Sequence, residues 1–173
     1  TPNTVVVLDE MTRIHPSVAN TLMPLLDHRR QVYLDDLGEL IRVAPGVVFM
    51  ATANLGSEYT GTWRWDAALE SRLEYQLEVS YLPRQQEIDV LVNKTGVDRE
   101  TAEGLVDVAN QARAATEDPK EPLGHAISTR QLLAASRLVV QGMPPADAME
   151  FTIVPTYSPA GGTESDRAHI LTI

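Results

Sequence analysis

Two adjacent acids, Asp9 and Glu10, follow directly on an apolar run at residues 4–8. Ligands of α/β proteins bind at the carboxyl ends of parallel strands, so two carboxylates at such a place suggest a magnesium nucleotide site. One carboxylate would hold Mg²⁺, directly or through water, and the next would orient an attacking water. A solvated strand end or a helix N-cap is the alternative interpretation of the same pair.

Three further polar residues stand at the ends of apolar segments later in the chain. Asn54 ends the segment "GVVFMATAN", Arg72 follows a short apolar helix in "DAALESRLE", and Arg130 lies in the first turn of a helix in "ISTRQLLAAS". Asn54 could instead cap a turn, and Arg72 could pair with a neighbouring glutamate. Arg130 could simply be exposed, but a cation at that helix end opposes the helix dipole, which favours a position facing an anion. Arg137 is the competing arginine in the same helix.

The elements that must position these residues follow from hydrophobic periodicity. The apolar runs 4–8 and 46–54 predict buried strands of a parallel sheet, and 75–82 alternates like a third strand. A hairpin is predicted at 31–44 and a loop at 57–66. Helices are predicted at 16–27, where Pro24 should kink the helix or end it early, and at 67–73, 84–95, 98–115, 129–141 and 145–151. The chain therefore divides into an α/β part at 1–82, a helical part at 83–155 and a flexible tail at 156–173, rich in Pro, Gly, Ser and Thr.

Composition excludes several classes of protein. The chain has 173 residues with a formal net charge of -10, which makes nucleic-acid binding through phosphates unfavourable overall. It contains no cysteine, so disulfides and thiolate metal sites are excluded, which fits a cytoplasmic protein. No apolar run approaches the ~20 residues of a membrane span. The four histidines are scattered without zinc-ligand spacing, and no nucleophile elbow is present.

The order of these features resembles the second half of an AAA+ ATPase. A strand with Asp-Glu, a hairpin, a strand ending in Asn, a helix with Arg, and a helical part with "STR" succeed one another across residues 4–142. Within that superfamily the chain is most similar to the MoxR, CbbQ and cobaltochelatase-type proteins, the dynein-related branch, which carries a hairpin in this place. The resemblance implies an α/β fold, a partial P-loop NTPase sheet with a β-hairpin insertion, followed by an all-α lid subdomain.

The resemblance also implies a role for each residue. Asp9 and Glu10 match the Walker B pair, with Asp9 serving Mg²⁺ and Glu10 polarising water, and Asn54 matches sensor 1. Arg72 matches the arginine finger offered to a neighbouring subunit, and Arg130 matches sensor 2, which reaches the phosphates of ATP from the lid. Phosphoryl transfer needs these types, because it depends on a metal, an oriented water and cations around developing charge.

One motif of that superfamily is absent from the sequence. The P-loop pattern G-x-x-x-x-G-K-[ST] does not occur, and none of the ten glycines is followed by lysine. In the related proteins this loop precedes the Asp-Glu strand, so we expect a Walker A loop before Thr1 in a longer protein. This chain alone is expected to be inactive.

The resemblance implies an ATP hydrolase that works as a homo-oligomeric ring, commonly a hexamer. Such a chaperone-like ATPase would remodel a partner protein or help to insert a metal cofactor. Two alternatives remain: a catalytically inert AAA+-shaped binding or scaffold domain, and a McrB-like motor for a nuclease. An intact upstream Walker A loop would favour the enzyme, and a degenerate one the scaffold.

Overall fold

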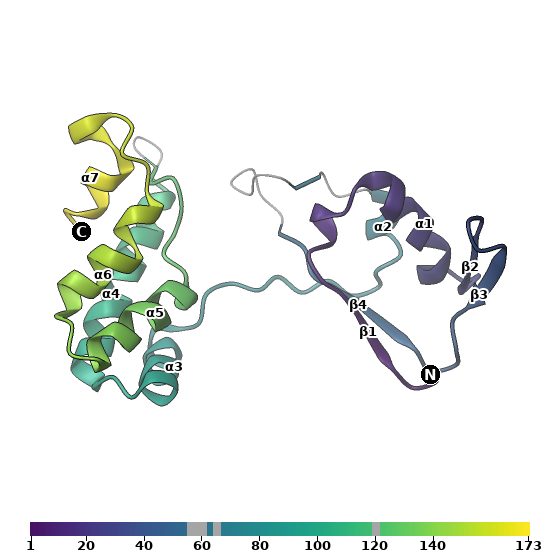
Figure 1. Cartoon of the computed structure of the whole chain (residues 1–173), viewed down its shortest axis with the longest axis horizontal. Helices are drawn as coiled ribbons and strands as arrows, with labels where there is room; N and C mark the ends of the chain where they lie inside the picture. Colours follow the sequence, from purple (N-terminus) through teal and green to yellow (C-terminus); the bar gives the residue numbers. More distant parts are fainter. Residues whose placement is uncertain (55–61, 64–66, 119–121) are drawn as a thin grey trace. The chain divides into compact units, whose positions relative to one another are not determined.

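The computed structural model describes residues 1–54, 62–63, 67–118 and 122–173. They form two compact units, residues 1–78 and residues 79–173, each described by itself below (Figure 1). Most of the loop predicted at 57–66 lies outside the described residues.

The first unit contains two parallel strands, β1 (Val5–Leu8) and β4 (Val48–Ala51), where the sequence predicts strands. Val5 pairs with Val48 and Leu8 with Ala51, so both strands end at the same edge of the sheet. That shared edge places the residues after β1 beside the residues after β4.

The two strands are less buried than their apolar sequences predict. Val5, Val7, Val48 and Met50, which alternate along the two strands, are between 55% and 58% exposed. The intervening residues are half-buried. The prediction of burial on both faces is therefore wrong for one face, because the described residues of the first unit leave it open to solvent.

A short 3₁₀ helix, η1 (Met11–Arg13), leads from β1 to helix α1 (Pro16–Leu26). The His15 ring caps α1 by accepting the Ser17 backbone N–H. Pro24 does not end α1 where it stands, and the helix continues through it to Leu26. Strands β2 (Gln31–Leu34) and β3 (Glu39–Arg42) then pair as an antiparallel hairpin, within the range 31–44 where the sequence predicts one.

No strand forms at residues 75–82, although the alternating sequence predicts one. Helix α2 (Ala67–Glu70) precedes this segment, which has no regular secondary structure. Tyr75, Leu77 and Val79 are between 84% and 92% exposed. A strand needs backbone partners on a neighbouring strand, and among the described residues this segment has none.

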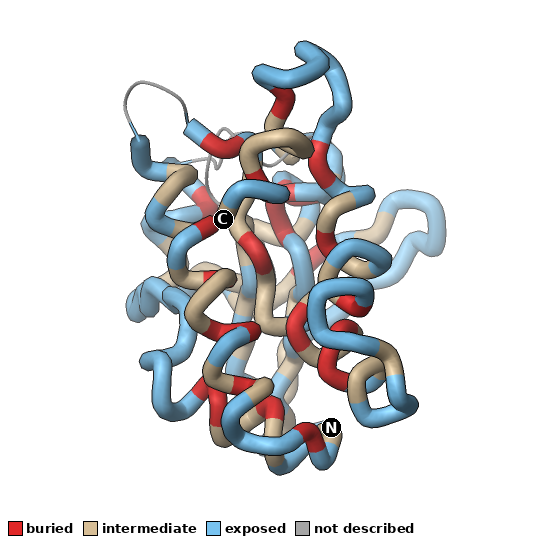
Figure 2. Tube along the Cα trace, turned by 90° about the vertical axis from the view of Figure 1, so that its left-hand side faces the viewer, coloured by how far each residue is buried: buried red, intermediate tan, exposed pale blue. Residues whose placement is uncertain are grey.

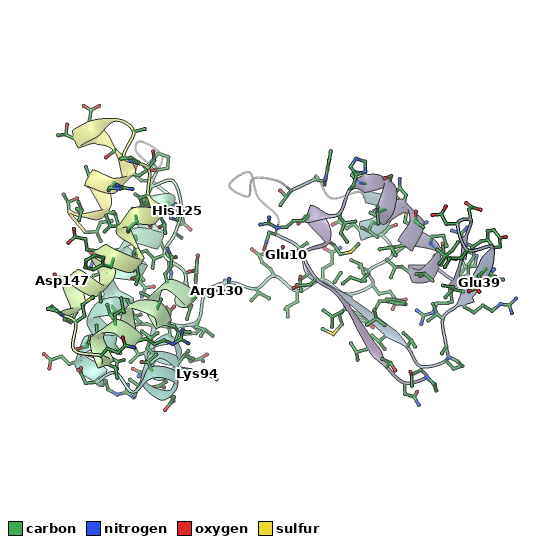
Figure 3. The ribbon with its side chains drawn as sticks, viewed as in Figure 1. Glu10, Glu39, Lys94, His125, Arg130 and Asp147 are labelled. Carbon is green, nitrogen blue, oxygen red and sulfur yellow. The ribbon has the colours of Figure 1, made fainter. Side chains whose placement is uncertain are left out.

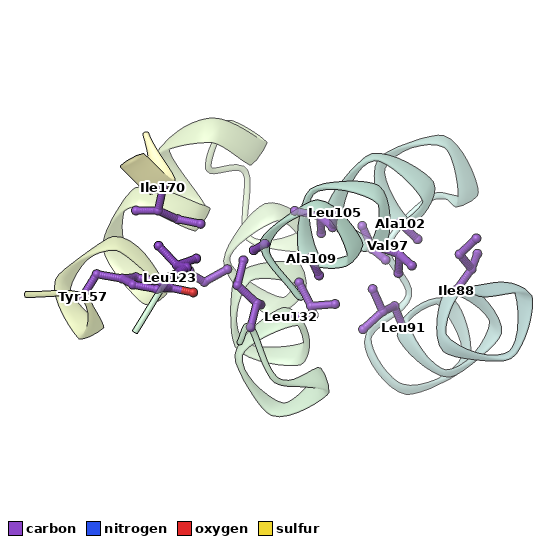
Figure 4. Close-up of a cluster of buried hydrophobic side chains, with 14 residues drawn as sticks. Ile88, Leu91, Val97, Ala102, Leu105, Ala109, Leu123, Leu132, Tyr157 and Ile170 are labelled. Atoms are coloured by element: carbon purple, nitrogen blue, oxygen red, sulfur yellow. The ribbon is translucent and has the colours of Figure 1, made fainter. Parts of the chain in front are cut away.

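The second unit is helical. Its main helices are α3 (Arg84–Thr95), α4 (Arg99–Thr116), α5 (Thr129–Val140) and α6 (Pro145–Thr152), which lie close to the predicted ranges. Buried positions recur along these helices (Figure 2) and meet in one apolar core (Figure 4). Asp98 caps α4 through the Thr101 N–H, and Ser128 and Gln131 form a reciprocal capping box at the start of α5.

The segment 156–173, predicted as a flexible tail, is packed in the structure. Tyr157 is 1% exposed and its hydroxyl donates to the backbone oxygen of His125 at 3.0 Å. Helices η2 (Val154–Thr156), η3 (Gly162–Glu164) and α7 (Asp166–Ile170) follow α6, and Ile170 packs near Tyr157 and Leu123 (Figure 4). The polar composition sets the turns, but these two apolar side chains bury the segment against the core.

Candidate functional site

Thr52, the first residue after β4, forms hydrogen bonds with both Asp9 and Glu10. Its hydroxyl donates to Asp9 Oδ1 at 2.5 Å and accepts the Glu10 backbone N–H at 2.9 Å. The backbone of Thr52 also bonds to both sides of the acid pair, from its N–H to the Leu8 oxygen and from the Met11 N–H to its own oxygen. The parallel register of β1 and β4 therefore fixes the backbone and one carboxylate at the carboxyl edge of the sheet.

Glu10 takes an unusual backbone conformation at this edge (Figure 3). Its φ of 51° and ψ of 46° lie in the left-handed region, where non-glycine residues are uncommon and often found at functional sites. Its Oε2 lies 2.8 Å from Nε of Arg13, and both side chains are about half exposed. The Glu10 carboxylate is thus reachable from solvent and has a cation beside it.

Asn54 lies at the same edge and is half-buried. Its backbone N–H donates to the hydroxyl of Thr12, which is 3% exposed. Because Thr12 belongs to η1, this bond joins the end of β4 to the turn that carries Glu10. The structure therefore places Asp9, Glu10 and the backbone of Asn54 at one edge of the β1–β4 sheet.

Arg72 makes a different contact from the glutamate pairing that the sequence left open. Its Nε lies 3.8 Å from Asp27 Oδ2 at the end of α1, which is a charge contact too long for a hydrogen bond. A second nitrogen, Nη1, donates to the Ala68 oxygen. The hydrogen bond from Arg29 lowers the pKa of Asp27 to about 2, so its carboxylate stays charged. Arg72 is 26% exposed, which leaves part of its surface accessible to a ligand.

Arg130 lies in the other unit, in the first turn of α5, where it is exposed (Figure 3). The capping box of Ser128 and Gln131 holds the backbone on both sides of it. Arg137, the competing arginine, is also exposed but belongs to the last turn of α5.

Two kinds of residue near these positions give weak sequence signals. A threonine after a strand is too common to mark Thr52, and its role depends on the β1–β4 register. Glu87 and Arg113, which form a buried ion pair in the helical unit, stand far apart in the sequence on two different helices. Only a charged residue on the apolar side of each helical pattern could have indicated such a pair.

The site can hold a cation through few protein ligands. Within the described ranges, no group of three or more His, Asp or Glu residues is arranged to bind a metal. Mg²⁺ commonly binds one or two carboxylates together with waters and phosphate oxygens, so a single exposed carboxylate such as Asp9 fits this ion.

No helix in the described part of the chain has the length and apolar character to cross a membrane.

The two parts of the chain match two family models in succession. The model of the AAA domain, dynein-related subfamily, matches residues 2–73. The model described as CbbQ/NirQ/NorQ C-terminal matches residues 87–168. The residues between the two matches, 74–86, include the boundary between the two structural units, which lies between 78 and 79.

Individual relatives include proteins named in the second family model, CbbQ and NirQ. The chain is 41% identical to the putative chaperone BssE of Thauera aromatica over 82% of this chain and 48% of BssE. It is 28% identical to protein CbbQ of Hydrogenophilus thermoluteolus (85% of this chain, 53% of CbbQ). It is 27% identical to the denitrification regulatory protein NirQ of Pseudomonas aeruginosa (87% of this chain, 56% of NirQ). The chain spans about half the length of these curated relatives. With both units matched in order, the chain belongs to the dynein-related AAA proteins, in the MoxR-like group of CbbQ, NirQ and NorQ.

Proposed function

We propose that this chain is the water-positioning and sensing part of an AAA ATPase. The observation that carries the proposal is the edge where Thr52 joins Asp9 and Glu10, with Asn54 beside them. In this proposal the first unit is the second half of a nucleotide-binding subdomain with the β2–β3 hairpin as its insertion. The helical unit is the lid that carries Arg130.

Each side chain then has a role in ATP hydrolysis. Asp9 binds Mg²⁺, directly or through water, with its carboxylate oriented by Thr52. When bound, the metal ion would supply positive charge against the charge that develops on the phosphates. Glu10 polarises the attacking water, and Asn54 orients that water with its amide. Arg72 and Arg130 bring positive charge to the phosphates, Arg72 from a neighbouring subunit, and such an arginine finger contributes ~10³–10⁵ in rate.

The whole protein would act as a homo-oligomeric ring, commonly a hexamer in this family. It would use ATP hydrolysis to remodel a partner protein or to assist the insertion of a metal cofactor. The chaperone name of BssE supports a partner protein as the substrate.

A catalytically inert scaffold is the second candidate, and one observation favours it. Glu10 forms an ion pair with Arg13, so its carboxylate could serve the turn of η1 rather than water. An exposed pair of this kind contributes little to stability, which leaves a catalytic use of Glu10 as the stronger interpretation.

The variant Glu10→Gln in the full-length protein separates the two candidates. The amide preserves the shape of the side chain but lacks charge and is a poor base, so ATP binding should remain while hydrolysis is nearly abolished. Arg13→Ala is the matched control, because it breaks the same ion pair but leaves the carboxylate. Hydrolysis that persists in Glu10→Gln, or that is lost equally in Arg13→Ala, would contradict the role of Glu10.

A further inference from the structure

A buried ion pair joins two helices of the second unit. Glu87 of α3 is fully buried, and Arg113 of α4 is 10% exposed. Their contact is bidentate, with Nη1 donating to Oε2 at 2.7 Å and Nη2 to Oε1 at 2.8 Å. Two parallel hydrogen bonds of this type fix the orientation of both side chains as well as their distance.

The same pair holds the start of α5. The hydroxyl of Thr129, the first residue of α5, donates to Glu87 Oε1 at 2.6 Å. Nε of Arg113 donates to the backbone oxygen of Ile127 at 2.9 Å. The pair Glu87 and Arg113, called the charged cluster below, is therefore hydrogen-bonded to the residues on both sides of the cap residue Ser128. Arg130 follows Thr129 directly in the sequence.

The cluster also contacts the segment that leads into the helical unit. The guanidinium carbon of Arg113 lies 3.9 Å from the centre of the Tyr81 ring, a cation–π distance. Tyr81 stands close to the boundary between the two units, before α3 begins. One charged cluster thus connects this segment to the turn that carries Arg130.

Burial of this ion pair beside the apolar core argues against a purely stabilising role. Ile88 and Leu132, next to members of the cluster in sequence or on the same helix, are fully buried in the hydrophobic core. A buried ion pair is often no more stabilising than apolar residues of similar volume, whereas it does fix register and orientation. Arg113 and Thr129 hold the pKa of Glu87 below its ordinary value against the opposing effect of burial, so the pair is charged at neutral pH.

We propose that Glu87 and Arg113 are positioning residues for Arg130, acting through the hydroxyl of Thr129 on the first turn of α5. This inference rests on the proposed role of Arg130 at the phosphates. The capping box makes the first turn a rigid unit, so the Thr129–Glu87 bond sets the direction in which Arg130 projects. Tyr81, which precedes α3, packs on Arg113 of the same cluster.

The test is a double-mutant cycle in the full-length protein, with ATP hydrolysis measured as kcat and KM. Thr129→Val removes the hydroxyl but keeps the shape of the side chain, and should lower kcat/KM by roughly ten- to hundredfold, as expected for a lost hydrogen bond to a charged group. Thr129→Ser restores the hydroxyl and should recover the wild-type value. Thr95→Val is the matched control, because the Thr95 hydroxyl bonds to the backbone, donating to the Leu91 oxygen and accepting the Val97 N–H.

The decisive comparison is made in the Arg130→Ala background. If Thr129 acts through Arg130, Thr129→Val should have no further effect on kcat/KM there, since the two changes remove the same interaction. An equal loss in both backgrounds, or no loss in Thr129→Val, would overturn the inference while the hydrolytic function stands. If Arg130→Ala itself leaves kcat and KM unchanged, the inference is also overturned. Hydrolysis that survives Glu10→Gln unchanged would instead show that the proposed function is wrong.

Discussion

At the scale of single residues, Thr52 is the link between the fold and the proposed chemistry. A hydroxyl is both a donor and an acceptor, and Thr52 uses both capacities, toward Asp9 and toward the Glu10 N–H. The left-handed backbone of Glu10 is sterically unfavourable, and the bond from its N–H to Thr52 helps to hold it. Residues that orient a metal-binding carboxylate in this way often affect metal affinity and activity almost as much as the metal-binding residue itself.

Thr52→Val in the full-length protein should therefore reduce ATP hydrolysis. Valine keeps the branched shape but loses the hydroxyl, which leaves Asp9 less well oriented. We expect about a tenfold lower kcat and a higher Mg²⁺ concentration for half-maximal rate, as for other residues that orient metal ligands. Thr52→Ser should retain most of the activity. A Mg²⁺ dependence that is the same in Thr52→Val and the wild type would refute the orienting role.

Arg72 can act within its own chain or across a subunit boundary, and mixed rings distinguish the two. Arg72→Ala and Glu10→Gln subunits should each be inactive alone. When they are mixed, some boundaries combine a normal Glu10 with a normal Arg72, so part of the hydrolysis should return. Asp27→Asn is the control for the contact seen within the chain. If mixing restores nothing, Arg72 does not act across the boundary. If Arg72→Ala alone assembles and hydrolyses normally, Arg72 is only a partner of Asp27.

At the scale of elements, the helical unit combines an apolar core with one charged cluster. Caps at Asp98 and Ser128 satisfy backbone groups at the starts of α4 and α5, and the core is closed by the packed segment around Tyr157. The Glu87–Arg113 pair lies between three helices, where loss of either partner leaves the other charge buried. Such a loss is costly even where the pair itself adds little.

Glu87→Gln should destabilise the helical unit in a pH-dependent way. The pKa of Glu87 in the folded chain is below its ordinary value of 4.5, so its stabilising contribution is present above pH 4.5 and is lost as the pH falls through the lower value. The free energy of unfolding should be ~3–5 kcal/mol lower in the variant at neutral pH. That difference should shrink below pH 4.5.

Urea unfolding followed by the helical circular-dichroism signal measures this difference. Asp89 and Asp107 also have lowered pKa values, because of hydrogen bonds from Arg99 and Arg84, but they are the same in both proteins and cancel. Glu150→Gln, at an exposed position of α6, is the control and should have little effect. A difference that is independent of pH would mean that Glu87 is not ionised in the folded unit.

At the scale of the whole molecule, the first unit exposes surfaces that parallel sheets normally bury. The face formed by Val5, Val7, Val48 and Met50 is open, and Tyr75 and Leu77 are almost fully exposed. Parallel sheets are usually covered on both faces, and open strand edges pair with other chains. The second unit, by contrast, closes around its own core.

The 173-residue chain alone should therefore bind Mg-ATP no tighter than the millimolar range and should self-associate. It lacks a P-loop sequence, and its open apolar face favours contact with other copies. Calorimetric titration and light scattering measure the two properties. The double variant Val7→Thr, Val48→Thr keeps β-branched residues and should reduce association. A stable monomer that binds ATP tightly would contradict both expectations.

Much of the local structure could be predicted from the sequence, because it depends on neighbours in the chain. The periods of α3 to α6, the caps at Asp98 and Ser128 and the hairpin are all readable from residues a few positions apart. The shared edge that follows Leu8 and Ala51 could also be predicted, since two parallel strands end there. The packed segment at 156–173 differs from the prediction, because burial of Tyr157 and Ile170 in the core overrode its polar composition.

The sequence by itself determined the order of the elements and the residue types available for phosphate chemistry, because these depend on local patterns. The tertiary structure alone decided which distant side chains meet. It placed the Thr52 hydroxyl on Asp9, Asp27 near Arg72, and Glu87 between Arg113 and Thr129. It also left 75–82 without a partner strand, since pairing depends on a neighbour in space rather than on alternation in the segment. Contacts between residues far apart in the chain carry no periodic signal, so only the folded coordinates reveal them.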